Sequence, residues 1–260
     1  MSRPFGDIMA EAYEAVGAYE PEIIYLYSDF RTLGRHLEEF PDRAAYCDAL
    51  LSPLLKRGKT LVMTTFTYTT EGRFDVLSTP TKLGVLNKWI LAQPDVCRSE
   101  HPLFSYAAVG PKSGIVLNIG KSAFGHDSIF TRLERQRAAF LHVGRPVWMG
   151  NTALHHVEHV GGATYRVHKA FRTEVFRGNI FVGSGYSAFL RRMDVAGETF
   201  AFTFRKASDQ LFARGLVRQV GNEEDLTNVS LLWYDDTLAA LHQMLGADPT
   251  IFINSSFIQY

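Results

Sequence analysis

The sequence predicts a layered α/β fold with a mixed central sheet, and two observations lead to this prediction. Strand-like and helix-like segments alternate over roughly the first 160 residues, and a strand-rich section follows them. No internal repeat, low-complexity tract or long Pro/Gly/Ser linker divides the 260 residues. We therefore expect one domain over residues 1–260, with a strand-rich subregion at about residues 163–234.

Helices are expected where apolar residues recur three or four positions apart. Residues 8–17 and 41–57 show this spacing, and Gly58 stands where a helix commonly ends in a left-handed glycine. Shorter segments with helix-like spacing are residues 84–92, 127–137, 151–160, 208–215 and 235–245.

Strands are expected where β-branched and aromatic residues gather. Glu22–Leu26 and Thr60–Phe66 have this composition, and Phe140–Gly144 is typical of a short buried strand. Residues 163–204 are rich in Val, Phe and Thr and are interrupted by glycines, which favours antiparallel strands joined by tight turns.

Composition excludes several classes of protein. Apolar residues make up 46% of the chain, which is ordinary for a globular protein, and no apolar run approaches the ~20 residues that span a bilayer. The N-terminus carries Asp7, Glu11 and Glu14 and no signal-type apolar stretch, so a cytoplasmic location is expected. The 27 basic residues balance 27 acidic ones, so neither nucleic acid nor a membrane is an expected partner. Cys47 and Cys97 form neither a disulfide framework nor a zinc knuckle.

The segment Thr152–His159 concentrates groups that transfer protons. Helical spacing places Thr152, His155, Glu158 and His159 near one face, whereas His156 points elsewhere. Histidine titrates nearest neutrality, and a carboxylate beside it fixes the tautomer and stabilises the imidazolium. This face is therefore a candidate acid–base site, although histidines that are merely exposed or buried in a core explain the same pattern.

The same segment also matches a metal signature. His155-x-x-Glu158-His159 fits H-x-x-E-H, in which two histidines bind zinc and the glutamate acts as base. This interpretation needs a downstream acidic ligand, for which Glu223 and Glu224 are the candidates. A zinc hydrolase therefore remains an alternative of a different class.

Two other segments suit an anionic ligand. Arg98, Ser99 and Ser105 stand among small residues, a composition that suits a phosphate-bearing molecule. Further on, Asp127 or Ser128 is placed to cap a helix whose N-terminus faces an anion. Cys97 precedes Arg98, and a nearby cation activates a thiol, so an acyl-cysteine route is a further alternative to a simply buried cysteine.

Five ordered segments together resemble the aminoglycoside 3-N-acetyltransferase family, also called antibiotic N-acetyltransferases. They are residues 26–34, residues 59–68, the block R-S-x-H-P-x-x-S-x-A-A-x-G at 98–110, F-G-x-x-S at 124–128 and T-x-x-H-x-x-E at 152–158. Tyr27 replaces a usual His, Asp29 replaces the second Ser of the first motif, and Thr64 stands where the family often has Pro.

The resemblance implies acetyl transfer from acetyl-CoA to a primary amine of an amino sugar, through a ternary complex and without a metal. It implies the family's own α/β arrangement rather than the small acetyltransferase fold. By similarity, His155 is the general base, Glu158 its carboxylate partner and Thr152 a hydroxyl near the thioester, where it or a backbone N–H is the candidate oxyanion donor. The expected CoA contacts are Ser28, Arg31, Arg98, Ser99, Ser105, Phe124 and Ser128.

The acceptor amine is less constrained. A polycationic aminoglycoside favours a carboxylate-lined site, whereas this chain is neutral overall and carries a later group of cations. These cations are Arg177, Arg191, Arg192, Arg205 and Lys206. They favour a nucleotide-linked amino sugar as acceptor, with a solvated charged face as the ordinary explanation and an aminoglycoside resistance enzyme as the alternative. The expected acceptor contacts are Asp29, Tyr68 and Asp75, with Trp233, Asp235 and Asp236 as further candidates.

Two further points stay open at this level. A homodimer is compatible with the sequence. A family member that binds CoA without turnover is a third reading, and the intact Thr152, His155 and Glu158 argue against it.

Overall fold

The computed structural model describes residues 4–29, 34–192, 202–222 and 228–253. Its centre is a seven-stranded mixed sheet in the order β11-β12-β6-β1-β2-β5-β4. Strands β1 (Ile23–Ser28), β2 (Thr60–Thr64) and β6 (Ala139–Val143) run parallel to one another. The other four strands pair antiparallel with a neighbour: β5 (Tyr106–Val109) with β2, β4 (Cys97–Arg98) with β5, β12 (Val229–Trp233) with β6, and β11 (Arg218–Val220) with β12. The mixed α/β prediction is confirmed, as are the three predicted strands; no individual strand was predicted at β5 or β12.

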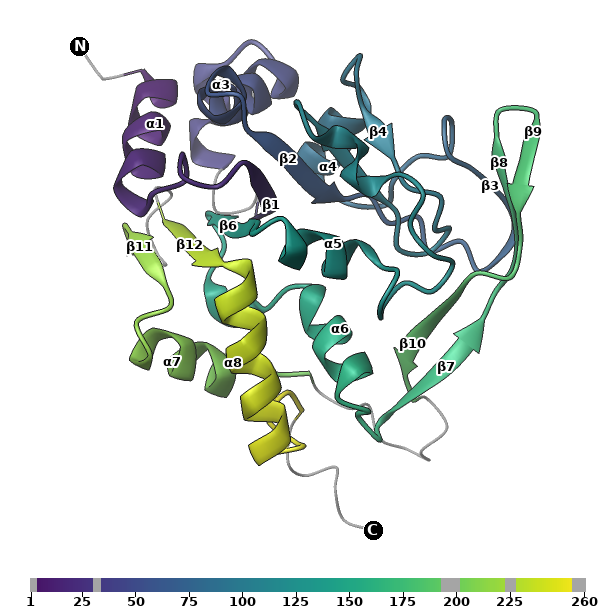
Figure 1. Ribbon diagram of the computed structural model, residues 1–260. Helices are drawn as coiled ribbons and strands as arrows, with labels where there is room; N and C mark the ends of the chain where they lie inside the picture. The colour runs from purple at the N-terminus through teal and green to yellow at the C-terminus, as the bar shows by residue number, and fades with distance from the viewer. Residues whose placement is uncertain (1–3, 30–33, 193–201, 223–227, 254–260) are drawn as a thin grey trace.

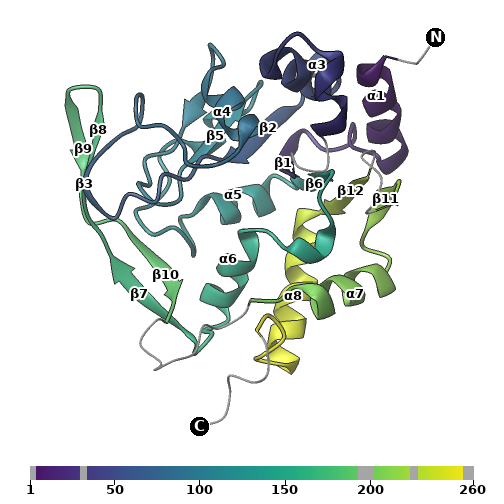
Figure 2. The same ribbon diagram turned by 180° about the vertical axis from the view of Figure 1, so that it is seen from behind.

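Helices cover both faces of this sheet. Along β1, Ile24 and Leu26 face one apolar core while Ile23 and Tyr25 face the other, because successive strand residues point to opposite sides. The first core packs against α1 (Phe5–Val16), α3 (Arg43–Lys56) and α4 (Val85–Leu91). The second packs against α5 (Ile129–Arg135), α6 (Ala153–Val160), α7 (Arg205–Ala213) and α8 (Tyr234–Ala247). Figures 1 and 2 show the two helical layers on either side of the sheet.

Local signals account for several helix ends. Asp42 caps α3 by accepting a hydrogen bond from the backbone N–H of Ala45 at 2.8 Å. Gly58 has φ +69° just beyond α3 and its N–H donates to the Leu55 carbonyl, as predicted. At α5, Ser128 occupies the N-cap position, but its hydroxyl donates to the Gly125 carbonyl at 2.6 Å instead of capping the helix. Ser128, one of the two predicted cap residues, therefore occupies the cap position without the capping side-chain hydrogen bond.

The later strands form an arm beside the main sheet, which we call the strand arm (residues 166–191 with β3). It contains β7 (Arg166–Ala170), β8 (Arg172–Arg177), β9 (Ile180–Gly183), β10 (Ser187–Arg191) and β3 (Glu71–Asp75). Strand β7 pairs with β10 and β8 with β9, both antiparallel as predicted, but β8 also pairs parallel with β3. In Figure 1 the arm lies on the right.

The predicted strand-rich subregion at 163–234 contains more than the strand arm. Strands β11 and β12 join the main sheet and α7 is helical, so the strand arm ends at β10 within the described residues. Short 3₁₀ helices complete the fold: η1 (Gly34–Glu39), η2 (Ser113–Val116) and η3 (Val147–Met149). In the described part of the chain, no helix combines the length and hydropathy that crossing a membrane requires.

The topology marks one edge of the sheet as special. The chain places β2 on one side of β1 and β6 on the other, so the strand order reverses at β1. Ligands of α/β proteins commonly bind at the carboxyl ends of parallel strands next to such a reversal. The end of β1 and the segment that follows β6 meet there.

Candidate functional site

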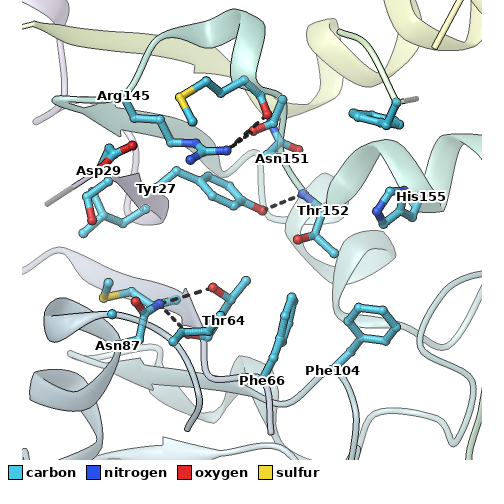
Figure 3. A pocket seen from close by; sticks show the side chains of 18 of the residues that line it. Tyr27, Asp29, Thr64, Phe66, Asn87, Phe104, Arg145, Asn151, Thr152 and His155 are labelled. Carbon is cyan, nitrogen blue, oxygen red and sulfur yellow. Dashed lines mark hydrogen bonds between the residues drawn. The ribbon is translucent and has the colours of Figure 1, made fainter. Parts of the chain in front are cut away.

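A cavity of about 730 Å³ opens at the carboxyl ends of β1, β2 and β6. This volume lies in the range of small-molecule sites, roughly 300–1,000 Å³. Its walls come from the end of β1, the end of β2, the start of α4, the segment from the end of β6 into α6, and the first and last residues of the arm segment 166–191. In Figure 3, Arg145, Asn151, Thr152 and His155 line one wall, while Thr64, Asn87, Phe66 and Phe104 line the facing wall. The cavity therefore collects residues that are distant in sequence.

Helix α6 presents His155 to this cavity. Its Nδ1 lies 2.8 Å from Oε2 of Glu158, one turn later, and a quarter of the His155 side chain (26%) is exposed while Glu158 is fully buried. Phe124 and Phe202 contact the imidazole edge to face, with ring centroids 5.9 and 5.8 Å away. His156 turns from this face, as predicted: it is buried, and its Nδ1 accepts from the Gly125 N–H. Helical spacing thus brings His155 and Glu158 together, as predicted.

The surroundings keep both groups near the protonation states that a base needs. Burial lowers the pKa of His155, the Glu158 carboxylate opposes this, and the charges of Arg166 and Arg191 lower it further. Burial alone would raise the pKa of Glu158, but His155 and Arg166 more than offset burial and the pKa is lowered. At neutral pH the pair is therefore an uncharged imidazole beside an ionised carboxylate.

Arg166 is a third member of this group that the sequence patterns did not single out. It lies at the start of β7, its Nε is 2.7 Å from Glu158 Oε2 and its Nη2 is 2.7 Å from His155 Nδ1. It also lines the cavity. The only sequence signal was an arginine in the strand that follows the T-x-x-H-x-x-E helix, and that signal alone is weak.

Thr152 and Tyr27 connect α6 to β1. Thr152 is the N-cap residue of α6 but makes no side-chain cap bond, and its backbone N–H donates to the Tyr27 hydroxyl at 3.3 Å (Figure 3). Both residues line the cavity, and burial raises the pKa of Tyr27. The phenol is therefore neutral, and it occupies the position where the family commonly has a histidine.

The expected acceptor contacts divide into two groups. Asp29 and Tyr68 line the cavity, and Tyr68 adopts the left-handed φ of +54°, an uncommon conformation for a bulky residue that often marks a functional position. Asp75 is not among the lining residues; its carboxylate accepts from the N–H groups of Leu77 and Gly178 within the strand arm.

Trp233, Asp235 and Asp236 lie at the other end of the sheet. Strand β12 runs antiparallel to β6, so Trp233 pairs with Ala139 at the start of β6 rather than at its carboxyl end. Asp235 pairs with Arg137 there, at 3.4 Å. These candidates for an acceptor pocket are thus remote from the cavity, because the sequence did not reveal that β12 is antiparallel.

The expected CoA contacts are also divided. Ser28 lines the cavity, Phe124 contacts the His155 ring, and Arg31 lies outside the described residues. The hydroxyl of Ser99 accepts from the Tyr106 N–H, and those of Ser105 and Ser128 donate to the carbonyls of Thr65 and Gly125. All three serines are buried. That CoA lies against them stays a prediction.

Arg98 is buried among backbone carbonyls. Its guanidinium donates to the carbonyls of Thr79, Thr65 and Val76 at 2.6, 3.1 and 3.3 Å, and to Ser105 Oγ at 3.3 Å. Together with Cys97 it borders a second cavity of about 270 Å³. Cys97 itself lies 3.5 Å from the Ser113 hydroxyl, and His155 borders the other cavity. The geometry described does not pair Cys97 with the histidine that an acyl-cysteine route needs.

The zinc interpretation finds little geometric support. His155 is engaged with Glu158, whereas His159 packs against the rings of His168 and Phe189. Among the residues that the structure describes, no group of three His, Cys, Asp or Glu side chains is placed to hold a metal ion. The proposed third ligands, Glu223 and Glu224, lie outside the described residues.

The later cations are dispersed rather than clustered. Arg177 pairs with Glu100 at 3.3 Å and borders the second cavity, and Arg205 lies over the Trp148 ring. Of the five cations singled out from the sequence, all of them described, Arg191 alone lines the main cavity. Arg145 and Arg166, which were not singled out, also line it.

Comparison with known proteins identifies the family. A family model described as aminoglycoside 3-N-acetyltransferase matches residues 26–180, more than half of the chain. No curated protein sequence matches significantly.

Several solved structures share the fold. AAC-IIIb in a binary complex with CoASH superposes with a TM-score of 0.74 at 18% identity, covering 93% of this chain and 96% of that one. AAC-VIa bound to sisomicin superposes with a TM-score of 0.73 at 18% identity, covering 93% of this chain and 97% of that one. The apoenzyme of aminoglycoside acetyltransferase AAC(3)-IVa superposes with a TM-score of 0.68 at 22% identity, covering 94% of this chain and 90% of that one. The family assignment thus agrees with the motifs, the fold and the position of the cavity. The chain belongs to the aminoglycoside 3-N-acetyltransferase family and is an acetyl-CoA-dependent N-acetyltransferase.

Proposed function

We propose that the enzyme transfers the acetyl group directly to a primary amine of an aminoglycoside, with His155 as general base. The observation that carries this proposal is the imidazole of His155 on the wall of the main cavity, with its Nδ1 held 2.8 Å from the buried carboxylate of Glu158. When Nδ1 carries the proton donated to Glu158, Nε2 is the nitrogen that can accept one. A base of this type typically contributes ~10²–10⁴-fold to the rate.

The proton path follows from this arrangement. The amine attacks the acyl carbon, the N–C bond forms and the C–S bond breaks. His155 takes the proton of the amine on Nε2 and returns it to the departing sulfur, so the base is regenerated. Glu158 stabilises the imidazolium between these two transfers. Thr152, at the N-terminus of α6, stands beside this path on the same wall (Figure 3).

The lining suits a CoA thioester, which supplies the activated acetyl group. Phe66, Phe104 and Leu190 give the cavity apolar surface, and Arg145 and Arg191 give it positive charge. Arginine binds phosphate groups through several N–H donors, and apolar walls suit an alkyl chain. We propose that CoA enters between these groups, with Ser28 at the end of β1 beside it. The buried Arg98, Ser99, Ser105 and Ser128 would then shape the wall from behind.

The family and one structural relative support an aminoglycoside acceptor. The matched family model carries that name, and the solved relative AAC-VIa is bound to sisomicin. Asp29, buried at the end of β1, offers the cavity a carboxylate for an ammonium group, and Tyr68 offers a ring at its rim. An ammonium beside a carboxylate is held in place by charge-assisted hydrogen bonds.

One observation favours a second acceptor, a nucleotide-linked amino sugar. Among the described residues that line the cavity, Arg145 and Arg191 stand against a single carboxylate, that of Asp29, while Arg166 is paired with the buried Glu158. A diphosphate on the acceptor would match this excess of positive charge, although CoA carries phosphates of its own. Thiol release in the presence of aminoglycosides and of nucleotide-linked amino sugars distinguishes the two. Turnover with aminoglycosides and none with sugar nucleotides supports the first acceptor, and the reverse supports the second.

The base assignment is tested with a matched pair of histidine variants. His155→Asn should reduce kcat by about 10²–10⁴-fold with each acceptor that the wild type uses. His159→Asn changes a histidine on the same helix that packs against His168 and Phe189, and its kcat should stay within a few-fold of wild type. A zinc hydrolase built on H-x-x-E-H requires both histidines, so equal losses would contradict our assignment. A His155→Asn rate close to wild type would also contradict it.

Two broader predictions accompany this function. We propose that the enzyme works in the cytoplasm and that a homodimer is its assembly to test first. Light scattering coupled to size exclusion would give the mass in solution, and a monomer at micromolar concentration would overturn the dimer.

A further inference from the structure

We propose that Arg166 is a positioning residue of this enzyme: it holds Glu158 as a carboxylate and keeps His155 unprotonated between turnovers. The inference rests on the proposed role of His155 and adds a residue that none of the family motifs quoted above contains. Its basis is a three-membered cluster of Arg166, Glu158 and His155, joined by contacts of 2.7, 2.7 and 2.8 Å.

The cluster is assembled from two elements and is shielded from water. Glu158 is fully buried and the Arg166 side chain is 6% exposed, so their ion pair is poorly screened by solvent. His155 and Glu158 come from α6, whereas Arg166 comes from the start of β7. A buried carboxylate without a cation would take up a proton, because burial disfavours its charged form. Arg166 is the permanent cation at hydrogen-bond distance from this carboxylate.

The contacts at His155 Nδ1 define what Arg166 can do. The ionised carboxylate of Glu158 has no proton to donate, so it can only accept a hydrogen bond from Nδ1. Arg166 has no acceptor, so it can only donate a hydrogen bond to Nδ1. A proton on Nδ1 therefore favours Glu158 and leaves Nε2 as the base, whereas a bare Nδ1 accepts from Arg166 and places the proton on Nε2. The negative charge of Glu158 must persist for the first arrangement to win. By pairing with Oε2 of Glu158, Arg166 secures that charge.

The charge of Arg166 also acts on the imidazole directly. The charged and titratable groups around His155 are Glu158 on its own helix, Arg166 from β7 and Arg191 from β10, and the Tyr165 hydroxyl lies near Glu158. Burial is the main cause that lowers the pKa of His155, Arg166 is the stronger of the two cations that lower it further, and Glu158 raises it. Removing Arg166 should therefore raise the pH at which the coupled pair of His155 and Glu158 takes up its first proton, because the cation disfavours a proton on either group. The pair would then be protonated at pH values where it now is free.

A purely structural role for Arg166 is the competing explanation. Its Nη1 donates to the Phe189 carbonyl at 3.2 Å and so ties β7 to β10. Loss of this bond would lower stability or activity without moving the titration of His155. The titration therefore separates the two roles.

The experiment compares Arg166→Met, Arg166→Lys and Lys169→Gln. Lys169 is an exposed cation on the same strand, which makes its variant a control for removing one positive charge from β7. The His155 ring is titrated by NMR, with its signals assigned by their loss in His155→Asn, and kcat/KM is measured against pH. We expect the first proton uptake of the His155–Glu158 pair, followed at the His155 ring, and the acidic limb of kcat/KM to move to higher pH by about one pH unit in Arg166→Met. Arg166→Lys, which keeps the charge but not the planar fork, should move less, and Lys169→Gln should not move either quantity.

The outcomes separate this inference from the proposed function. A His155 midpoint that stays at its wild-type value in both Arg166 variants overturns the role of Arg166, whatever happens to the rate. A midpoint that moves while the kcat/KM limb does not supports the role of Arg166 in the cluster and contradicts His155 as the base. If Arg166→Met does not fold, Arg166→Gln removes the same charge with a side chain that keeps an N–H donor. A His155 midpoint within the NMR error of wild type in that variant refutes the inference.

Discussion

Two buried arginines of this enzyme have opposite surroundings. Arg98, the last residue of β4, donates to three backbone carbonyls and one serine hydroxyl, none of which changes charge near neutral pH. Arg166, at the start of β7, contacts the carboxylate of Glu158 and the imidazole of His155, both of which titrate. Burial lowers the pKa of Arg98 to about 10, so its guanidinium stays charged at neutral pH.

The difference shows how the partners of a buried cation decide its role. Carbonyl partners cross-link backbone segments, and the charge of Arg98 thereby joins the loops after β2 and β3 to the strand β4. A carboxylate and an imidazole as partners couple the cation to proton transfer instead. Arg98, which lies inside one of the family motifs, thus has backbone carbonyls and a hydroxyl as partners, whereas Arg166, which lies in no motif, contacts the candidate base.

Glu158→Gln should give the largest effect on the Arg166 side of this comparison. The substitution leaves a buried guanidinium without a counter-charge, which should lower the free energy of unfolding by roughly 3–5 kcal/mol. Because Glu158 raises the pKa of His155, its neutralisation should also move the acidic limb of kcat/KM to lower pH, the opposite of Arg166→Met. Urea unfolding at pH 7 and a pH–rate profile of the folded variant measure the two effects.

Glu100→Gln is the matched control for that experiment. It removes the carboxylate from the partly exposed pair with Arg177, and such pairs contribute only about 0–1 kcal/mol. If Glu100→Gln lowered the free energy of unfolding as much as Glu158→Gln, the buried cluster would stabilise the fold no more than an exposed ion pair does.

Arg98→Met should give the next largest effect, and on stability alone. Three buried carbonyls and a hydroxyl lose their donor, which should cost roughly 2–4 kcal/mol of unfolding free energy. The pH profile of the folded variant should match wild type, and KM for acetyl-CoA should stay within a few-fold. Arg177→Met, which alters a more exposed arginine bordering the same second cavity, controls for loss of charge near it.

The opposite result would break the comparison. A large rise in KM for acetyl-CoA with unchanged stability would mean that Arg98 binds the cofactor, as the motif first implied. The two arginines would then both be functional, and the carbonyl contacts would be secondary.

The helical elements could be predicted from the sequence because their signals are local. Residues 41–57 show helical spacing with an acidic cap and a terminal glycine, and α3 forms there. Strands β5 and β12 were missed because their sequences, YAAV and VSLLW, are short apolar runs without alternation. Strands that are buried on both faces have continuous apolar sequences of this kind. Periodicity alone cannot distinguish such a strand from a buried helical segment.

The contacts of the candidate site also divide into those that follow from local sequence spacing and those that depend on distant segments. His155 and Glu158 are three residues apart on one helix, so their contact follows from spacing. Arg166 reaches them only because β7 begins beside α6, and Asp75 is drawn away because β3 pairs with β8 in the strand arm. Contacts of this kind depend on strand pairing between distant segments, and no local pattern encodes them.

The smallest expected difference between Arg98 and Arg166 is in how stability depends on pH below neutrality. All variants share a loss of stability at acid pH that comes from other buried histidines. Burial lowers the pKa of His101 and His156 to about 4 and that of His142 to about 3. These groups bind protons more readily in the unfolded chain, so stability is fully present above the unfolded value of about 6.5 and is lost as pH falls. Between the unfolded value and its own folded pKa, each histidine lowers the free energy of unfolding by up to about 1.4 kcal/mol for each pH unit of acidification. Only differences between variants are therefore diagnostic.

The stability cost of Arg166→Met should shrink as pH falls from 7 to 5, whereas that of Arg98→Met should not. In the wild type the pKa of Glu158 is lowered, so the ion pair stabilises the fold above the unfolded carboxyl value and is lost only as pH falls through the folded one. Without Arg166, burial raises the pKa of this carboxyl, which then takes up a proton at higher pH and relieves the unpaired charge. The gap to wild type should therefore narrow by about 1 kcal/mol in urea unfolding, while the Arg98→Met gap stays constant because its hydrogen-bond partners do not titrate. Parallel pH dependence of the two gaps would show that Glu158 does not rely on Arg166 for its charge, and the distinction between the two buried cations would disappear.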